Sequence, residues 1–273
     1  MKKYIPFFKA GMMEELSYKA VIYIWVLISV LQLACVLFLW SAIYSNAEGS
    51  IINGFTFEQM IVYFVFTNIF AFICLESSTL GMIDDEIKDG TIAISFIKPI
   101  SYRFRFLAMA YGANMTRAIV LGIPAYIVAF TIFTILGYVK CETPVEFLIR
   151  ILMFLSCTIL AIGLNDCINY ICGILCFYTT AAWGLNQMKN VVLNFFSGVF
   201  IPLSFFPGTF GRICRLLPFA GLTQNPVYIL MGAANTEQSI QFILRNLGWW
   251  LVFEIVAKLL FQHASKRVTV QGG

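Results

Sequence analysis

Charge is what this sequence has least of. Of its 273 residues, 12% are charged and 60% are hydrophobic. Soluble domains average about 25% charged and about 45–50% apolar residues. Water could not cover so much apolar surface on one compact domain. The composition therefore excludes an ordinary soluble protein and favours a chain that is solvated by lipid.

Residues that carry common enzyme chemistry are also scarce. The chain has a single histidine, His263, and it contains no Gly-x-x-x-x-Gly-Lys-Ser/Thr phosphate-binding loop and no Gly-Lys dipeptide. It also lacks the Gly-x-Ser-x-Gly pattern of serine hydrolases and any His-x-x-x-His pair. We therefore expect no catalytic, cofactor-binding or metal-binding residues, and no ATP hydrolysis by this chain alone.

Most of the eight cysteines fall in apolar runs. Cys172 and Cys176 are four residues apart, a spacing that would suit two metal ligands on one helical face. No histidine or carboxylate pair accompanies them, and buried thiols usually pack as small hydrophobic groups, so we interpret both as core residues. Cys141 and Cys214 are both expected on the outer side, where a disulfide between them is an open alternative.

Long apolar runs predict an all-α membrane protein, a single transmembrane domain over residues 1–273 with six transmembrane helices. About 20 apolar residues cross the hydrocarbon core. The first run is longer than a signal-peptide core of about 7–15 residues, so we interpret it as a retained span. Asn165 and Asp166 are expected to form a tight turn between the fourth and fifth spans. The predicted spans are residues 20–44, 58–82, 106–139, 147–165, 167–190 and 242–262.

The N-terminal segment, residues 1–19, has an apolar stripe at helical spacing. Its members are Ile5, Phe8, Met12 and Leu16. Lysines lie away from this stripe, as in helices that lie in the membrane interface. We predict an interfacial amphipathic helix here. The alternative is a short helix packed on protein.

Glycine and proline interrupt the apolar stretch over residues 191–226. Among them are Gly198, Pro202 and Pro207. Lipid cannot satisfy the polar groups of a broken backbone, so such a segment must be buried in protein or line a wet cavity. We predict a re-entrant hairpin of short helices at the outer side.

Basic residues are distributed unequally between the two sides of the predicted spans. With the N-terminus inside, the inner segments hold Lys2, Lys3, Lys9, Lys19, Lys88, Lys98, Arg103, Arg105, Lys266 and Arg267, and the outer loops hold Lys140, Arg212 and Arg215. Basic residues concentrate in cytoplasmic loops. The pattern predicts that both termini are cytoplasmic.

The loop between the second and third predicted spans carries a distinctive element, residues 84–101, which we call the coupling segment. Asp84 and Glu86 suit a helix N-terminus, where carboxylates meet the positive end of the dipole. Gly90 can end that helix in a left-handed conformation. A short amphipathic run follows and stops at Pro99. A simple charged connector that lies on the headgroups is the alternative interpretation.

Five pieces of the chain occur together: MKKYIPFFKAG, LFLWSAIY, EIKDGTIAISFIKPIS, FFSGVFIPLSFFP and the closing TVQGG. Jointly they resemble the ABC-2 type permeases, the membrane subunits of bacterial ATP-driven exporters. The likeness is greatest to a branch often encoded as paired permeases beside one ATPase, whose pattern I-x-x-G-x-[IL]-x-x-x-[LI]-[LI]-K-P is similar to the third piece. Polar residues after Trp183 depart from that branch and leave the outer end of the fifth span open.

The resemblance implies a permease subunit of an exporter in the bacterial plasma membrane. Its partners would be ABC ATPase subunits that carry ATP and magnesium, a second permease of the same or a sister kind, and membrane lipids, but no nucleic acid. Gly198, Pro202 and Pro207 would belong to an outer lid, and Ile87 would fill a pocket of the ATPase. The residues implied to contact the ATPase are Asp85, Glu86, Ile87, Lys88, Asp89, Gly90 and Thr91. An ion-coupled transporter or channel without an ATPase is the alternative function.

Polar residues inside predicted spans are costly and are treated as functional by default. The candidates for the transport pathway are Asn68, Glu76, Glu254 and Lys258. The last two are four residues apart in the favourable Glu-before-Lys order, so we expect them to neutralise each other. A contact with substrate is the alternative for this pair. Arg117 is expected to extend toward the inner surface.

Overall fold

The computed structural model describes residues 2–17, 19–47, 49, 51–138, 143–179 and 181–267. Within them, five helices are long and apolar enough to cross a membrane: Val26–Ser45, Phe57–Lys88, Tyr102–Ile135, Pro144–Leu175 and Thr236–Ala264. The chain is therefore an all-α, multi-pass membrane protein. Six such helices were predicted, and the sixth is missing because the fifth predicted span has a different form.

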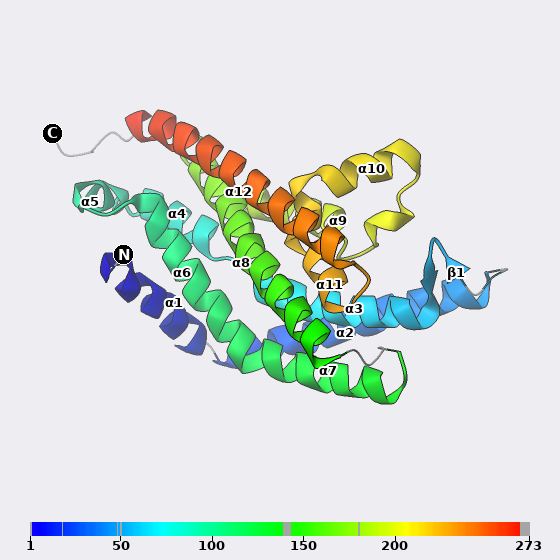
Figure 1. The fold of residues 1–273 in the computed structure, drawn as a ribbon. Helices are drawn as coiled ribbons and strands as arrows, with labels where there is room; N and C mark the ends of the chain where they lie inside the picture. The colour runs from blue at the N-terminus through cyan, green and yellow to red at the C-terminus, as the bar shows by residue number, and fades with distance from the viewer. Residues whose placement is uncertain are drawn as a thin grey trace.

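The chain first runs the length of the molecule and back (Figure 1). Helix α2 (Lys19–Ser45) leads to a small hairpin of β1 (Ile51–Ile52) and β2 (Phe55–Thr56). Helix α3 (Phe57–Cys74) returns beside α2, and Thr56 and Gln59 form a capping box at its start. After a break come α4 (Thr79–Lys88) and α5 (Ile92–Ile97). We call the end that holds α5 the inner end and the end that holds β1–β2 the outer end.

The third crossing is one bent rod made of α6 (Tyr102–Arg117) and α7 (Ile123–Ile135). Between them lies a single wide π-helical turn, Ala118–Gly122. Pro124 follows directly and has no amide to donate, which explains why the regular hydrogen-bond ladder changes here. The rod carries α1 (Ile5–Ser17) along its inner half.

Helix α1 packs on α6 with almost no space between the two backbones. A Cβ added to Gly112 would lie 2.0 Å from the carbonyl oxygen of Phe8, and one added to Gly11 would lie 2.1 Å from that of Met109. Small residues permit such close crossings. Ile5 and Leu16 of the predicted apolar stripe remain about half exposed, at 50% and 44%. One face of α1 therefore rests on protein.

Helix α8 (Pro144–Leu175) runs without interruption through Asn165 and Asp166. The predicted turn at these residues, and with it the predicted span boundary, is wrong. Both side chains find partners inside the bundle: the Asn165 amide donates to the carbonyl oxygens of Cys74 and Leu75, each at 3.0 Å. Asp166 accepts from Thr79 and Arg103. Polar groups satisfied in this way need no turn to reach water.

Helices α8 and α12 (Thr236–Ala264) lie side by side and run in the same direction. Asn246 of α12 contacts Cys157 of α8, and further along both helices the rings of Phe261 and Tyr170 lie 6.0 Å apart. The chain between them must therefore return from the inner to the outer end. Its first part is α9 (Ala182–Phe196), which has 15 residues and is shorter than the roughly 20 that a membrane crossing needs.

Short helical pieces complete the return from the end of α9 to the start of α12. They are Leu203–Phe205, α10 (Gly208–Leu216), Pro218–Leu222 and α11 (Gln224–Leu230). Glycines and prolines separate them, as the sequence of this stretch predicts. The pieces pack against α3, α8 and α12 rather than stand apart. The fifth predicted span is thus replaced by a short helix and a folded segment.

Candidate functional site

The coupling segment forms the inner end of the molecule (Figure 1). Asp85, Lys88, Asp89, Gly90 and Thr91 are exposed there. Gly90 has φ +69°, which confirms the predicted left-handed end of the first helix. The described start of the chain lies beside it, because Lys3 donates to the carbonyl oxygen of Pro99 at 3.2 Å. Most residues of the predicted ATPase contact are therefore free to meet a partner.

Two residues of that predicted contact turn inward instead. The Glu86 carboxylate accepts hydrogen bonds from Arg105 at 2.5 Å, from Tyr102 at 2.9 Å and from Ser95 at 3.4 Å. Ile87 is partly buried against the protein's own core beside Ile83, whereas from the sequence we expect it to fill a pocket of a partner. The reason is helical spacing: Ile83 and Ile87 are four residues apart and share the buried face of α4.

Helix α5 supplies apolar groups that the predicted contact omits. Ile94 is 55% exposed and Ile97 is 84% exposed. Ile92 and Ser95 of the same helix are buried. The amphipathic spacing of residues 92–97 is the sequence feature from which this exposed apolar face could have been predicted. Exposed isoleucines next to polar groups form the kind of surface that a partner buries.

Arg103 joins four helices at the inner end through what we call the Arg103 cluster: Thr79, Arg103, Asp166 and Glu254. The guanidinium donates to Glu254 at 2.7 and 3.1 Å and also binds Asp166. Thr79 donates to Asp166 at 2.5 Å. The cluster thereby ties α4, α6, α8 and α12 together.

The predicted pairing of Glu254 with Lys258 is wrong. Glu254 pairs with Arg103, and Lys258 is exposed. A guanidinium that binds a carboxylate through two nitrogens in a partly buried site forms a stronger interaction than a helical pair, which contributes about 0.2–0.5 kcal/mol. Sequence inspection could not find this partner because Arg103 and Glu254 are 151 positions apart.

A break in the second crossing was not predicted. Residues Leu75–Ser78 separate α3 from α4 without any proline. The break frees backbone carbonyl groups, and two side chains from other helices satisfy them. Asn165 binds the carbonyls of Cys74 and Leu75, as described above, and the carbonyl of Glu76 accepts from Arg117 at 2.8 Å.

Arg117 does more than extend toward the surface. Besides the Glu76 carbonyl, it binds Glu15 of α1 at 2.5 Å. One guanidinium therefore holds both the broken helix and the N-terminal helix on α6. Unwound backbone at membrane depth is tolerated only where protein or a wet cavity receives it, and such breaks often adjoin transport sites.

A small cavity of about 110 Å³ adjoins the break, between α2, α3 and α9. Its polar lining residues are Ser29, Gln32, Asn68, Glu76 and Asn194. The structure thus brings together two of the predicted pathway residues, Asn68 and Glu76. Glu254 belongs to the Arg103 cluster instead.

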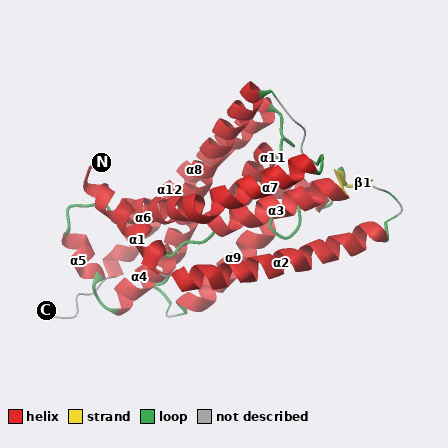
Figure 2. Ribbon diagram, turned by 90° about the horizontal axis from the view of Figure 1, so that it is seen from below, coloured by secondary structure: helices red, strands yellow, loops and turns green. Residues whose placement is uncertain are grey.

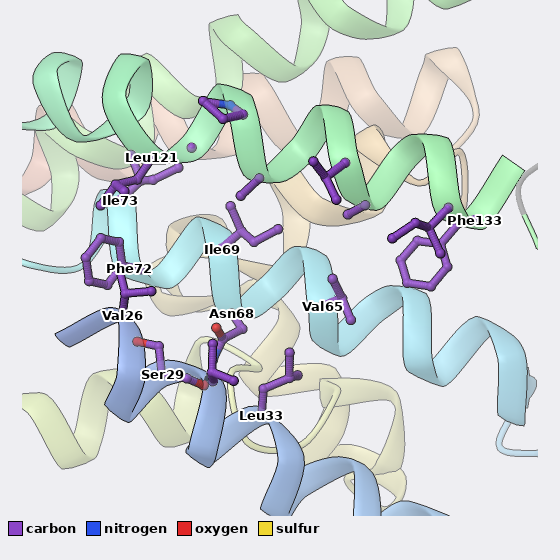
Figure 3. A pocket seen from close by; sticks show the side chains of 17 residues that line it. Val26, Ser29, Leu33, Val65, Asn68, Ile69, Phe72, Ile73, Leu121 and Phe133 are labelled. Carbon is purple, nitrogen blue, oxygen red and sulfur yellow. Dashed lines mark hydrogen bonds between the residues drawn. The ribbon is translucent and has the colours of Figure 1, made fainter. Parts of the chain in front are cut away.

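A larger, apolar cavity of about 550 Å³ lies on the other side of the α2–α3 contact, against α7 (Figure 3). It shares Ser29, Asn68 and Phe72 with the polar cavity. The Asn68 amide donates to the Ser29 carbonyl oxygen at 3.4 Å, between the two spaces. Ser29, Asn68 and Phe72 therefore lie between a polar compartment and an apolar one.

The predicted lid residues occupy different surroundings. Gly198 has φ +88°, and its carbonyl oxygen accepts from the buried Tyr63 hydroxyl at 2.6 Å. Pro202 is buried, whereas Pro207 is exposed at the start of α10. Gln224 accepts from the Leu203 amide at 2.7 Å and so closes the segment on itself.

The cysteines that could have held a metal lie in apolar packing. Cys176 is buried with Leu80 and Ala182, and Cys172 packs against the same group. Over the described ranges, no three His, Cys, Asp or Glu side chains are placed to hold a metal ion. Cys214 is buried and free, and Cys141 lies outside the described residues.

Comparison with known proteins gives one match. Residues 30–272 match the family model described as ABC-2 family transporter protein. No curated protein and no solved structure gives a match. The matched region takes in α2 from residue 30 onward, the other four long apolar helices, the coupling segment and the broken segment that precedes α12. The chain belongs to the ABC-2 family of transporter proteins.

Proposed function

We propose that this chain is the permease subunit of an ATP-driven exporter in the bacterial plasma membrane. It forms half of the substrate pathway, and a second permease of the same or a sister kind forms the other half. A separate ABC ATPase binds ATP with magnesium and hydrolyses it, because this sequence has no phosphate-binding loop. Membership in the ABC-2 family supports transport of the ABC type, for which such an ATPase is the general partner.

The observation that carries the proposal is the exposed inner surface of the coupling segment. It combines polar groups around Gly90 with the two exposed isoleucines of α5, Ile94 and Ile97. Beneath it, the hydrogen bonds of Glu86 fix α4, α5 and α6 relative to one another. A motor subunit that moves this surface would therefore move the inner ends of the crossing helices with it.

The course of the chain supports a sixth crossing. Because α8 and α12 run in the same direction, we propose that α9 and the short pieces after it cross the membrane in the opposite sense. The described start of the chain and the inner end of α12 both lie beside the coupling segment. With the basic residues on that side, both termini are cytoplasmic.

Ile97→Asp and Gly90→Val test the proposal. The first removes an apolar group from the docking surface, and the second forces a β-branched residue into a positive-φ position. We expect both variants to reach the membrane in normal amount, to retain less than about one tenth of the ATPase on an affinity-purified permease, and to lose export. A tenfold loss corresponds to about 1.4 kcal/mol.

Ile51→Asp is the matched control, because Ile51 is 62% exposed in the hairpin at the opposite end. It should keep the ATPase fully bound. Normal ATPase retention and export in both test variants would refute the docking assignment. Transport by purified permease without any ATPase would instead favour the ion-coupled alternative.

A further inference from the structure

The side chain of Glu76 carries a carboxylate at the break in the second crossing. Glu76 is exposed at the helix break and lines the polar cavity. No ion pair joins its side chain to a basic group among the described residues, although five other ion pairs are found there. A carboxylate that lines a cavity at the membrane boundary without an ion-pair partner points to a cationic ligand.

The nearby basic groups have other partners. Arg117 pairs with Glu15 and touches Glu76 only at its backbone carbonyl. The Lys189 ammonium of α9 donates to the Asn169 side chain, and its influence on Glu76 is electrostatic only. Neither cation therefore neutralises the Glu76 carboxylate by direct contact.

The rest of the cavity is suited to an organic cation. Half of its ten lining residues are polar and half are apolar, and the apolar ones include Phe72. An aromatic face and a carboxylate together attract substituted ammonium groups. An inorganic cation would instead need several oxygen ligands at short distance. Among the described residues that line this space, Glu76 is the one carboxylate, and the other polar ones, Ser29, Gln32, Asn68 and Asn194, are uncharged.

The neighbouring apolar cavity can take a hydrocarbon tail. It opens between α2 and α7, and Figure 3 shows Val26, Leu33, Val65, Ile69 and Phe133 around it. Helix α2 forms one wall of both cavities and is little buried. Within its most apolar stretch, 6% of the residues lie inside the protein. Figure 2 shows it along the edge of the molecule. Since α2 contacts the bundle mainly through α3, a small displacement would join the two spaces.

We propose that Glu76 binds the cationic head group of an amphipathic substrate whose tail occupies the apolar cavity. The inference rests on the proposed function and names its substrate class. Asparagines at positions 186, 190 and 194 recur every four residues and so share one face of α9. Because Asn194 lines the cavity, this polar stripe leads from it toward the inner end. Head groups would enter along this face.

The test measures binding to purified permease without any ATPase. The probe is radiolabelled dodecyltrimethylammonium in micelles of the uncharged detergent dodecyl maltoside. We expect saturable binding that Glu76→Gln weakens at least tenfold. Glu58→Gln, which alters an exposed carboxylate at the outer end of α3, is the matched control and should leave binding unchanged. Asn194→Leu should weaken binding without removing a charge.

Three results would overturn the inference. The first is equal binding by wild type and Glu76→Gln. The second is competition by dodecyl sulfate as effective as competition by unlabelled probe, and the third is displacement by millimolar sodium or calcium. A variant that has lost its fold is recognised by a lower unfolding temperature. Loss of ATPase docking with ammonium binding intact would overturn only the proposed function, whereas intact docking and export without ammonium binding would overturn only this inference.

Discussion

Five ion pairs between described residues lie in the inner half of the molecule, where aromatic rings also pack, and extensive aromatic packing joins the helices of the outer half. At the inner end, Arg103, Arg105 and Arg117 of one helix bind carboxylates on α12, α4 and α1. At the outer end, Trp40 of α2 lies 5.0 Å from the ring of Phe205, and Phe66 stacks on Phe130 at 5.8 Å.

The two kinds of contact respond differently to displacement. A charge-assisted hydrogen bond fixes the distance and direction between its partners, and leaving one partner buried alone is costly. Apolar side chains between membrane helices gain little by leaving lipid, so their packing can be exchanged for lipid contact at low cost. We therefore interpret the inner half as the part that moves as a unit, and the outer half as the part that changes shape.

Among the changes considered, removal of the Arg103 side chain should destabilise the inner half most. Arg103→Met would leave Asp166 and Glu254 without their shared partner. Breaking a buried ion pair from one side costs about 3–5 kcal/mol. We expect a large fall in the unfolding temperature of the solubilised protein. Arg212→Met, at an exposed arginine of α10, is the control and should have no effect. If both variants unfold at the wild-type temperature, the Arg103 cluster does not stabilise the inner half.

The α1–α6 crossing should be the next most sensitive point. Gly112→Val would push a side chain into the backbone of Phe8, so we expect α1 to leave α6 at a cost of about 1–3 kcal/mol. Increased proteolysis within residues 5–17 would report the loss. Gly248→Val is matched to it, because a Cβ at Gly248 meets nothing within 4 Å. Equal protection of α1 in both variants would show that the close crossing is dispensable.

A neutral hydrogen bond in the outer half should contribute least to the stability of the protein. The Tyr126 hydroxyl donates to the Phe66 carbonyl oxygen at 3.0 Å. Tyr126→Phe removes this bond but keeps the ring, and a neutral hydrogen bond contributes about 0.5–1.5 kcal/mol. We expect a small drop in unfolding temperature and normal ATPase retention. A drop as large as that of Arg103→Met would contradict the division into a rigid and a deformable half.

Composition and periodicity predicted what depends on neighbours in sequence. The apolar runs gave the membrane class, and Gly90 gave the left-handed helix end. What failed depended on partners far along the chain. Asn165 and Asp166 look like a turn because two polar residues interrupt an apolar run. In the fold, the broken helix before Thr79 and the guanidinium of Arg103 satisfy them.

The helix break had no local signal either. Leu75–Ser78 contains neither proline nor glycine, and its freed carbonyls are stabilised by Asn165 and Arg117 from other helices. The role of Glu86 was hidden for a similar reason, since Arg105 is 19 positions away. A charged residue in an amphipathic helix can face a partner protein or its own core, and only the packing of α6 distinguishes the two.

The length of α8 sets the depth of the Arg103 cluster in the bilayer. Its 32 residues extend about 48 Å at about 1.5 Å per residue, against a hydrocarbon core of about 30 Å. On the proposed topology, with Pro144 placed at the outer boundary and α8 upright, about 20 residues of α8 cross the hydrocarbon, which then ends near Leu164, two residues before Asp166. On this topology the cluster lies at the inner edge of the hydrocarbon, and the last turns of α8 extend beyond it on the proposed cytoplasmic side. A thicker bilayer would draw these charges into hydrocarbon at a modest cost per ångström, so we expect export to slow as lipid acyl chains lengthen.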